Sequence, residues 1–256
     1  MARVKQSVCV PMFPSLSLEE LCAAAAEIGY AAVEFWGRDE GFDAQVATAT
    51  RHGLTVASFA GHSRTALNNR ADHDQAETEL KASIDVAAHH GVTGVICFSG
   101  DRQPDRDEAE AIEVTAEGLR RVAPYAERKG VNVNLELLNS KVDHAGYDCD
   151  HTNWAVAVCE KVGSSRVKIL YDIYHMQIME GDIIRTVRDS IRWIGHFHTA
   201  GNPGRSDMDA TQELNYTGIC LAIAATGYDL FVGHEFAPKG EPVEALRQAF
   251  GICDAG

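Results

Sequence analysis

Residues 132–175 read NVNLELLNSKVDHAGYDCDHTNWAVAVCEKVGSSRVKILYDIYH. Two apolar runs rich in strand-forming residues, Asn132–Asn139 and Val167–His175, predict two β-strands. Between them, Asp150–Val162 spaces its apolar residues by three and four and ends just before Gly163, which predicts a helix. A strand, a helix and a second strand in this order indicate a parallel sheet with helices packed on its faces.

The same alternation continues in both directions along the chain. Six further strands are predicted, at Gln6–Met12, Ala31–Trp36, Leu54–Gly61, Gly94–Gly100, Ile194–Gly201 and Leu230–Pro238. Further helices are predicted at Asp43–His52, Asp72–His90, Asp105–Lys129, Gly181–Ser190, Thr217–Thr226 and Glu241–Cys253. The first helix begins with the capping-box pattern Ser17-Leu18-Glu19-Glu20 and ends at Gly29. Eight strands, each followed by a helix and without a low-complexity linker, predict a single (β/α)8 TIM barrel domain over residues 1–256.

Other α/β architectures lack their signatures in this chain. An open doubly wound sheet more often carries a GxGxxG turn after its first strand, and here that turn is Pro11-Met12-Phe13-Pro14-Ser15. Neither GxxxxGKS nor GxxxxGKT occurs in the sequence. Dinucleotide binding and P-loop phosphate chemistry are therefore not expected.

Composition and charge exclude further classes of protein. With 45% hydrophobic and 23% charged residues, the chain has the composition of an ordinary globular protein rather than of a disordered or collagen-like one. Its 23 Lys and Arg against 37 Asp and Glu give a net charge of −14, which repels phosphate backbones and anionic lipids. We therefore expect neither nucleic acid nor membrane as a partner. A small anionic substrate stays compatible, because local cations or a metal ion can reverse the potential in a cleft.

The seven cysteines and the apolar runs predict a cellular location. The cysteines include no CxxC pair, and their odd number does not suggest a disulfide framework. Residues 1–10 lack an apolar core of signal-peptide length, and no uncharged apolar run approaches the ~18 residues of a membrane span. The expected location is the reducing cytoplasm. Assembly into a homo-oligomer is left open.

Four successive predicted strands each carry a side chain able to bind metal near the carboxyl end, where the active site of a TIM barrel lies. These residues are Glu136, Asp172, His198 and Glu235. In the strand Asn132–Asn139, the two-residue period places Asn132, Asn134 and Glu136 on one face. In the seventh strand, the same period places His196 and His198 on one face.

A charge inside a barrel is costly unless it is paired or bound to metal. Taken singly, a late-strand Glu can be salt-bridged at the rim, a His can be a hydrogen-bonded core residue, and Asp172 can cap the turn that follows it. Four unrelated buried charges would each need a separate partner, so their coincidence favours one metal site. A divalent cation such as Mn²⁺, Mg²⁺ or Co²⁺ is expected rather than zinc, because carboxylates dominate and no thiolate contributes.

Four neighbouring residues are predicted to bind substrate at the same mouth. His175 follows the sixth strand and can hydrogen-bond a substrate oxygen. Arg205 follows the glycine-rich turn Gly201-Asn202-Pro203-Gly204 and can bind a carboxylate through bidentate hydrogen bonds. An exposed loop position is the alternative for both. Glu34 and His62 end the second and third strands, where each can line the mouth, support the metal ligands or lie at the rim.

Three sequence motifs resemble the hydroxypyruvate isomerase family. They are Tyr171-Asp172-Ile173-Tyr174-His175-Met176-Gln177-Ile178-Met179-Glu180-Gly181-Asp182, Asn202-Pro203-Gly204-Arg205 with Glu213-Leu214-Asn215-Tyr216, and Glu136-Leu137-Leu138-Asn139. The likeness covers most of residues 131–240 and, more loosely, the opening helix and Val33-Glu34-Phe35. It also extends to the wider xylose-isomerase-like barrels, including the ketose 3-epimerases. It implies a xylose-isomerase-like TIM barrel whose metal ligands are Glu136, Asp172, His198 and Glu235.

The resemblance also implies a metal-dependent isomerase of carbohydrate metabolism. A 2-hydroxy carbonyl compound would chelate the metal through both oxygens, which acidifies the adjacent C–H by stabilising an ene-diolate, and Glu136 or Glu235 would remove the proton. With hydroxypyruvate, the product would be tartronate semialdehyde, and Arg205 would bind the carboxylate; with a neutral ketose, Arg205 would contact a distal hydroxyl. Hydroxypyruvate isomerases commonly have Gln at the place of His198, whereas 3-epimerases have His, and Leu137 and Lys141-Val142-Asp143-His144 also depart from the family pattern. A ketose 3-epimerase or another sugar isomerase is therefore kept as the alternative.

Particular residues argue against two other classes of protein. An endonuclease IV type of barrel binds several zinc ions and needs histidines on strands three and four and an Asp-x-His after strand seven. This chain has His62 but only Ser99 and Gly100 at the fourth strand, and Asp207-Met208-Asp209 lacks the histidine. A non-catalytic sugar-binding barrel is less expected, because both Glu136 and Glu235 are present.

Overall fold

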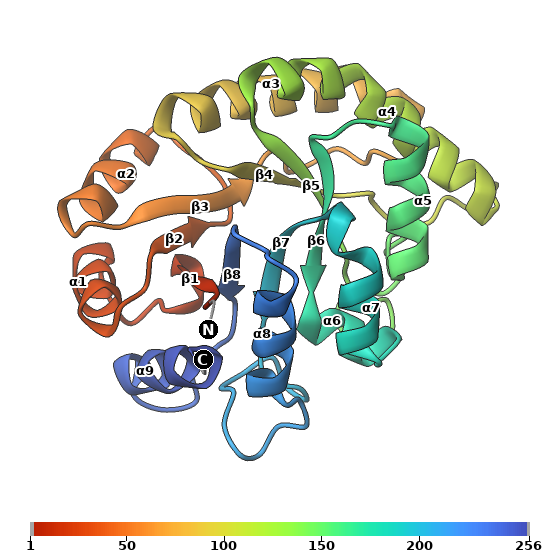
Figure 1. Ribbon diagram of the computed structural model, residues 1–256. Coiled ribbons are helices and arrows are strands. Elements are labelled where there is room, and N and C mark those ends of the chain that lie inside the picture. Colours follow the sequence, from red (N-terminus) through yellow and green to blue (C-terminus); the bar gives the residue numbers. More distant parts are fainter. Residues whose placement is uncertain (1–2, 255–256) are drawn as a thin grey trace.

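A closed barrel of eight parallel strands forms the centre of the molecule. The computed structural model describes residues 3–254, so residues 1, 2, 255 and 256 of the predicted domain lie outside the described part. The strands are β1 (Lys5–Cys9), β2 (Ala32–Phe35), β3 (Thr55–Ala60), β4 (Gly94–Cys97), β5 (Asn132–Glu136), β6 (Val167–Asp172), β7 (Ile194–Thr199) and β8 (Phe231–His234). They pair in sequence order, and β1 closes the barrel against β8 (Figure 1). The predicted TIM barrel is confirmed.

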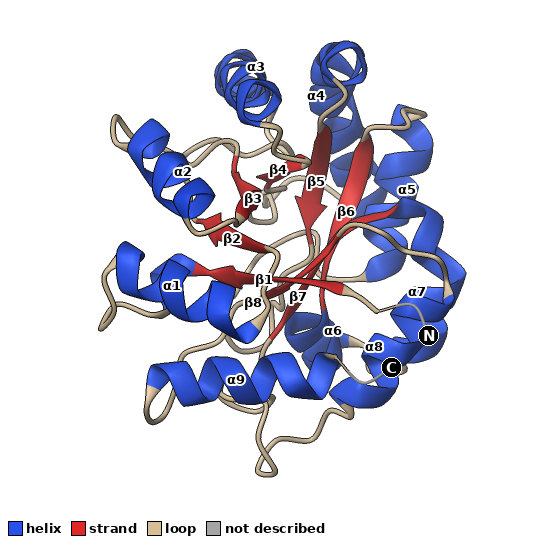
Figure 2. Cartoon of the chain, turned by 60° about the vertical axis from the view of Figure 1, so that its left-hand side comes forward, coloured by secondary structure: helices blue, strands red, loops and turns tan. Residues whose placement is uncertain are grey.

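Helices surround the strands as an outer layer (Figure 2). They are α1 (Leu18–Ile28), α2 (Phe42–Arg51), α3 (His73–His90), α4 (Glu108–Lys129), α5 (Thr152–Val162), α6 (Ile173–Met179), α7 (Ile183–Ser190), α8 (Tyr216–Ala225) and α9 (Pro242–Cys253). Every predicted helix is present, with ends that differ by at most a few residues. The capping box of α1 is formed between Ser17 and Glu20, and Gly29 ends this helix in the left-handed conformation, with φ of 115°.

Several predicted strands end earlier than expected, because the chain turns sharply at the carboxyl rim. The first strand stops at Cys9, where Pro11 lies in a short 3-10 helix. The sixth strand stops at Asp172, and the next seven residues form α6, which was not predicted. The Asp172 side chain accepts a hydrogen bond from the His175 backbone N–H, so it caps this helix. The eighth strand also ends earlier than predicted, at His234, so that Glu235 lies one residue beyond β8.

An apolar core fills the layer between the strands and the helices. Leu135 of β5 and Phe197 of β7 belong to this core and are fully buried. The alternate residues Glu136, His196 and His198 are buried as well, but they form polar contacts with one another and with other strands. The two-residue period predicted for these strands therefore separates an apolar face from a polar face. No helix within residues 3–254 is long and apolar enough to cross a membrane.

An irregularity in the pairing of β6 and β7 determines which polar residues of the two strands lie side by side. The pairing skips Gly195, so that Leu170 is opposite His196 and Asp172 is opposite His198. An extra residue of this kind is a β-bulge, which redirects the side chains that follow it. Gly195 therefore helps to place His198 beside Asp172.

We expect the substitution Gly195→Ala to destabilise the fold. A Cβ atom at this position would overlap Asn134 Oδ1 and would lie 2.7 Å from Lys168 Cβ. Overpacking of this kind typically lowers the free energy of unfolding by about 1–3 kcal/mol, measurable by urea denaturation. The control is Gly251→Ala in α9, where nothing lies within 4 Å of the added Cβ. That change should stabilise the protein by about 0.5–1 kcal/mol. A Gly195→Ala variant as stable as the unmodified protein would contradict the tight packing of the bulge.

Candidate active site

The four residues singled out as metal ligands lie together at the carboxyl end of the barrel. One ligand atom from each of Glu136, Asp172, His198 and Glu235 lies within 4.8 Å of the others, and all four residues are buried. They come from β5, β6, β7 and the position directly after β8. We call these four residues the acidic cluster. Residues far apart in the sequence thus offer three carboxylates and one imidazole to a single point.

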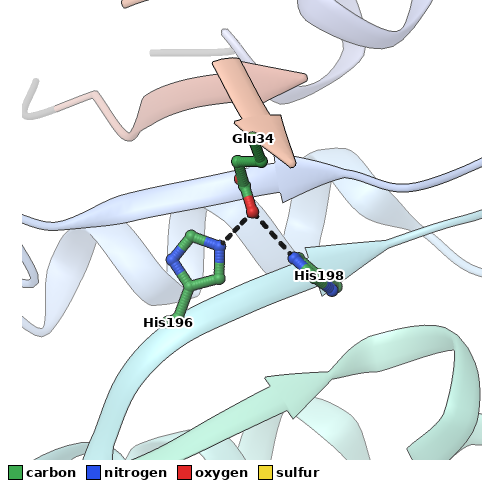
Figure 3. Close-up of side chains that lie close together, drawn as sticks. All are labelled: Glu34, His196 and His198. Atoms are coloured by element: carbon green, nitrogen blue, oxygen red, sulfur yellow. Dashed lines mark hydrogen bonds and ion pairs between the residues drawn. The ribbon is translucent and has the colours of Figure 1, made fainter. Parts of the chain in front are cut away.

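The ring of His198 lies between Glu34 on one side and two carboxylates of the acidic cluster on the other. Its Nε2 lies 3.0 Å from Glu34 Oε2, which is also 3.0 Å from His196 Nε2 (Figure 3). Its Nδ1 lies 3.3 Å from Glu235 Oε2 and 3.7 Å from Glu136 Oε1, yet it is buried without a hydrogen-bond partner. A carboxylate oxygen only accepts hydrogen bonds, so Nε2 carries a proton. In the neutral ring, the Nδ1 lone pair therefore faces the carboxylates.

Burial perturbs the ionisation of the acidic cluster. It raises the pKa of Glu136 and of Asp172 above their usual range. Burial also acts to raise the pKa of Glu235, but the nearby His198 and Arg205 outweigh it and hold that pKa below its usual value. For His198, burial acts to lower the pKa, and the charges of Glu235 and Glu34 more than reverse this effect. The cluster therefore has an excess of acceptor groups that a cation would stabilise.

A divalent cation fits the acidic cluster on two observations. Among the described residues, Arg205 supplies the one guanidinium that pairs with the cluster, and it contacts only Glu235. Buried carboxylates are costly without compensating charge. In addition, the unpartnered Nδ1 of His198 is an atom that a metal ion would satisfy. Three carboxylates and one imidazole are ligands that suit Mn²⁺, Mg²⁺ or Co²⁺.

His175 lies directly beside the cluster and is fully buried, so an exposed loop position does not apply to it. Its Nδ1 is 2.6 Å from Asn139 Nδ2, and its Nε2 is buried without a hydrogen-bond partner, 3.7 Å from Asp172 Oδ2. Asn139 also donates to Asp143, which in turn accepts from the Tyr174 hydroxyl. Burial lowers the pKa of His175, which keeps the ring neutral. This network holds the ring and leaves one of its nitrogen atoms available.

Arg205 reaches the cluster from the loop after β7. Its Nη2 donates to Glu235 Oε2 at 2.7 Å, and its Nε is buried without a partner. The backbone at Arg205 has φ of 50°, a left-handed conformation that is uncommon for a residue with a side chain. The loop begins at Gly201, where a Cβ atom would overlap the carbonyl oxygen of Asp207. The glycine-rich turn thus brings the guanidinium over the barrel mouth.

A cavity of about 410 Å³ opens above the cluster. Two of the residues that line it, Trp36 and His144, were not predicted from the sequence. Trp36 is 59% exposed, but its indole N–H donates to Glu235 Oε1 at 2.9 Å. His144 lines the same cavity and has a buried, unpartnered Nε2. Trp36 lies two residues after Glu34, so the strand period carried one step further would have selected it. His144 lies in a loop, where no periodic signal exists.

The remaining two predicted residues, Glu34 and His62, line this cavity but have partners within the protein. Glu34 Oε1 accepts from the Ser7 hydroxyl, while its Oε2 faces the two histidines of β7. The Nε2 of His62 accepts from the Phe98 backbone N–H at 2.9 Å, and its Nδ1 lies 2.7 Å from Thr65 Oγ1. Their polar atoms are therefore already occupied, which favours a supporting position over direct substrate contact.

Comparison with known proteins yields a family and named relatives. A family model described as xylose isomerase-like TIM barrel matches residues 22–253. The chain is 33% identical over 230 residues to a 2-oxo-tetronate isomerase of Cupriavidus necator, covering 87% of each chain. It is 30% identical over 199 residues to a hydroxypyruvate isomerase of Escherichia coli, covering 77% of this chain and 76% of that one. A crystal structure described as an AP endonuclease, family 2, from Brucella melitensis superposes with a TM-score of 0.82 at 26% identity, covering 96% of this chain and 97% of that one.

The buried ring of His62 predicts a pH dependence of stability. Burial lowers its pKa to about 4, whereas an exposed histidine titrates near 6.5. Between these values the unfolded chain binds a proton that the folded ring does not, so this residue makes stability fall by about 1.4 kcal/mol per pH unit as the pH decreases. In the variant His62→Gln, whose side chain does not titrate, that contribution is lost and the slope is smaller. Urea denaturation between pH 4.5 and about 6.5 measures the slope, and equal slopes would contradict a neutral buried ring.

Proposed function

The chain belongs to the xylose isomerase-like TIM barrel family and is an isomerase, and we propose that it isomerises a small 2-hydroxy carbonyl compound with the help of a divalent metal ion. The proposed reaction converts hydroxypyruvate to tartronate semialdehyde. The observation that carries this proposal is the convergence of four buried ligand atoms within 4.8 Å of one another, beneath a cavity that Arg205 also lines.

The acidic cluster is the proposed metal site. Glu136, Asp172 and Glu235 would bind the ion through carboxylate oxygens, and His198 would bind it through Nδ1. When bound, a divalent ion supplies positive charge beside the substrate oxygens and so makes the neighbouring C–H more acidic. Manganese, magnesium or cobalt suits the donor set better than zinc.

Glu136 and Glu235 are the residues proposed to move the proton. Both are buried and both line the cavity, so each carboxylate faces the space that a substrate would occupy. In the isomerisation, one carboxylate oxygen takes the proton from the carbon that bears the hydroxyl group and gives it to the neighbouring carbonyl carbon. The proton of the hydroxyl group passes to the former carbonyl oxygen, so that the two carbons exchange their carbonyl and hydroxyl groups. In an epimerisation, the second carboxylate would instead return a proton to the opposite face of the first carbon.

Arg205 favours an acid over a neutral sugar as substrate. Its guanidinium is held at the cavity with an unpartnered Nε, and a guanidinium binds a carboxylate through two parallel hydrogen bonds. The names of the two relatives also denote 2-oxo acids as their substrates. His198, the residue type of the ketose 3-epimerase pattern, supports a 3-epimerase as the second candidate. In that reaction Arg205 would contact a distal hydroxyl group.

DNA repair is not proposed, although the fold resembles the Brucella structure. A net charge of −14 opposes binding to a phosphate backbone. His62 takes part in neither of the ligand groups found within residues 3–254, and both of its ring nitrogens are occupied. A barrel that only binds sugar is also not favoured, because both Glu136 and Glu235 lie in the cluster. A small-molecule substrate and the cytoplasm as location stay predictions, and the oligomeric state stays open.

The reaction can be followed by NMR after incubation of the metal-loaded enzyme with hydroxypyruvate in D₂O. We expect tartronate semialdehyde that has acquired deuterium at carbon. The variants Glu136→Gln and Glu235→Gln should each lower kcat by about 10²–10⁴-fold, the usual contribution of a positioned acid–base group. The control Glu244→Gln changes an exposed residue of α9 and should keep full activity. Metal analysis of each variant separates loss of the ion from loss of proton transfer. Absence of both product and deuterium would contradict this reaction, and a ketose panel in the same assay then tests epimerisation.

Removal of Arg205 should affect acids more than neutral ketoses. The variant Arg205→Ala loses charged hydrogen bonds worth about 1.5–3 kcal/mol, so kcat/KM for hydroxypyruvate should fall about 10- to 150-fold. Arg205 also contacts Glu235, and that loss affects every substrate alike. Steady-state kinetics therefore compares the loss of kcat/KM for hydroxypyruvate with the loss for any ketose that the enzyme converts. The difference between the two losses is the contribution of the carboxylate contact. Equal losses for both substrates would contradict a role of Arg205 in binding the carboxylate.

A further inference from the structure

We propose that Glu34 is a positioning residue that presents Nδ1 of His198, and not Nε2, to the metal ion. This inference rests on the proposed function, because it assigns Glu34 a task toward an ion in the acidic cluster. Within residues 3–254, Glu34 is the one buried carboxylate that contacts His198 and does not belong to the acidic cluster.

Three protein groups hold the Glu34 carboxylate in place. Its Oε1 accepts from the Ser7 hydroxyl, and its Oε2 lies 3.0 Å from both His196 Nε2 and His198 Nε2 (Figure 3). Glu34 is only 1% exposed, so water does not compete for these oxygens. A carboxylate with both oxygens engaged from β1 and β7 has little freedom to reorient.

The contact with Glu34 determines which nitrogen of His198 is free. A carboxylate oxygen only accepts, so His198 donates through Nε2–H. The hydrogen bond made by one ring nitrogen of a histidine sets which nitrogen binds a metal. The other nitrogen, Nδ1, faces Glu136 and Glu235 and has no hydrogen-bond partner. The contacts of both nitrogens therefore indicate the same state of the ring, with the proton on Nε2 and Nδ1 free to bind the metal ion.

The barrel is built to accommodate this contact. Between β2 and β3 the pairing skips Ala57, so that Glu34 is opposite Ser58, and this irregularity lies directly before Glu34. On β8, a Cβ atom at Gly233 would overlap Glu34 Oε1 and lie 2.9 Å from His198 Cδ2. A strand irregularity and a glycine thus leave the space that both side chains fill.

A second metal ion is the competing explanation for the same residues. Glu34, His196 and His198 also lie within metal-binding distance of one another. Hydrogen bonds of 3.0 Å account for this geometry without an ion. The two explanations differ in the number of ions bound per chain, which makes them separable.

The experiment titrates the full chain with Mn²⁺ and follows binding by calorimetry and electron paramagnetic resonance. We expect one ion per chain and an affinity about 10- to 100-fold weaker in Glu34→Gln, the usual effect of losing such a partner. The matched control is Asp148→Asn, which also converts a buried carboxylate to an amide but lies outside the cluster. Its Mn²⁺ affinity should be unchanged. If Glu34→Gln fails to fold, Ser7→Ala removes one of the three groups that hold Glu34 and should weaken Mn²⁺ binding to a smaller degree.

A second readout follows the His198 ring itself. In the Mg²⁺-loaded protein, ¹⁵N NMR of the histidine side chains should show His198 protonated at Nε2, and Glu34→Gln should disturb this state. Unchanged affinity together with an unchanged ring state in Glu34→Gln would overturn the role of Glu34. Two ions per chain, one of them lost in Glu34→Gln, would overturn it in favour of a second metal site. These measurements use no substrate, so an error in the proposed reaction does not affect them. Absence of any divalent-ion binding would overturn both proposals.

Discussion

The burial of four carboxylates at one end of the barrel is the constraint on which the rest of the site depends. Removing each charge from water costs several kcal/mol unless partners compensate it. Glu34 is compensated by two histidines and a serine, and Glu235 by His198, Arg205 and Trp36. Compensation is incomplete for Glu136 and Asp172, whose pKa values burial raises. This remaining imbalance is the physical reason that the site suits a divalent ion.

The regular barrel brings the carboxyl ends of the strands together, and its irregularities position the side chains of the candidate site. The bulge at Gly195 brings His198 opposite Asp172, and the end of β6 at Asp172 lets this residue cap α6 while it still faces the cluster. The loop after β7 turns through Gly201 and carries Arg205 back over the same point. Each irregularity costs some stability or regularity of pairing, and each lies next to a polar residue of the site. These three departures from regular geometry thus lie next to the proposed ligands.

The similarity to relatives named as isomerases establishes an isomerase, and the proposed choice of substrate rests on the residues around the cluster. Arg205 supplies a fixed positive charge at one side of the cavity, while Phe35, Phe98 and Leu138 contribute apolar wall. Trp36 covers Glu235 from the solvent side, and His144 offers a nitrogen without a partner. The proposed substrate, a small acid with adjacent oxygens, suits a cavity lined by both polar and apolar side chains. Most of these residues lie in the loops after the strands, where active sites of TIM barrels are usually built.

The order of strands and helices followed from the sequence, because apolar spacing and capping residues are local signals. The same period selected Glu136, Asp172, His198 and Glu235, since the carboxyl ends of parallel strands must meet. Local signals did not predict α6, the early strand ends or the cavity residues Trp36 and His144. Nor did they show that Glu34 contacts His198, a residue 164 positions away. Which nitrogen of a ring is free depends on contacts between distant strands, and only the closed barrel brings those strands together.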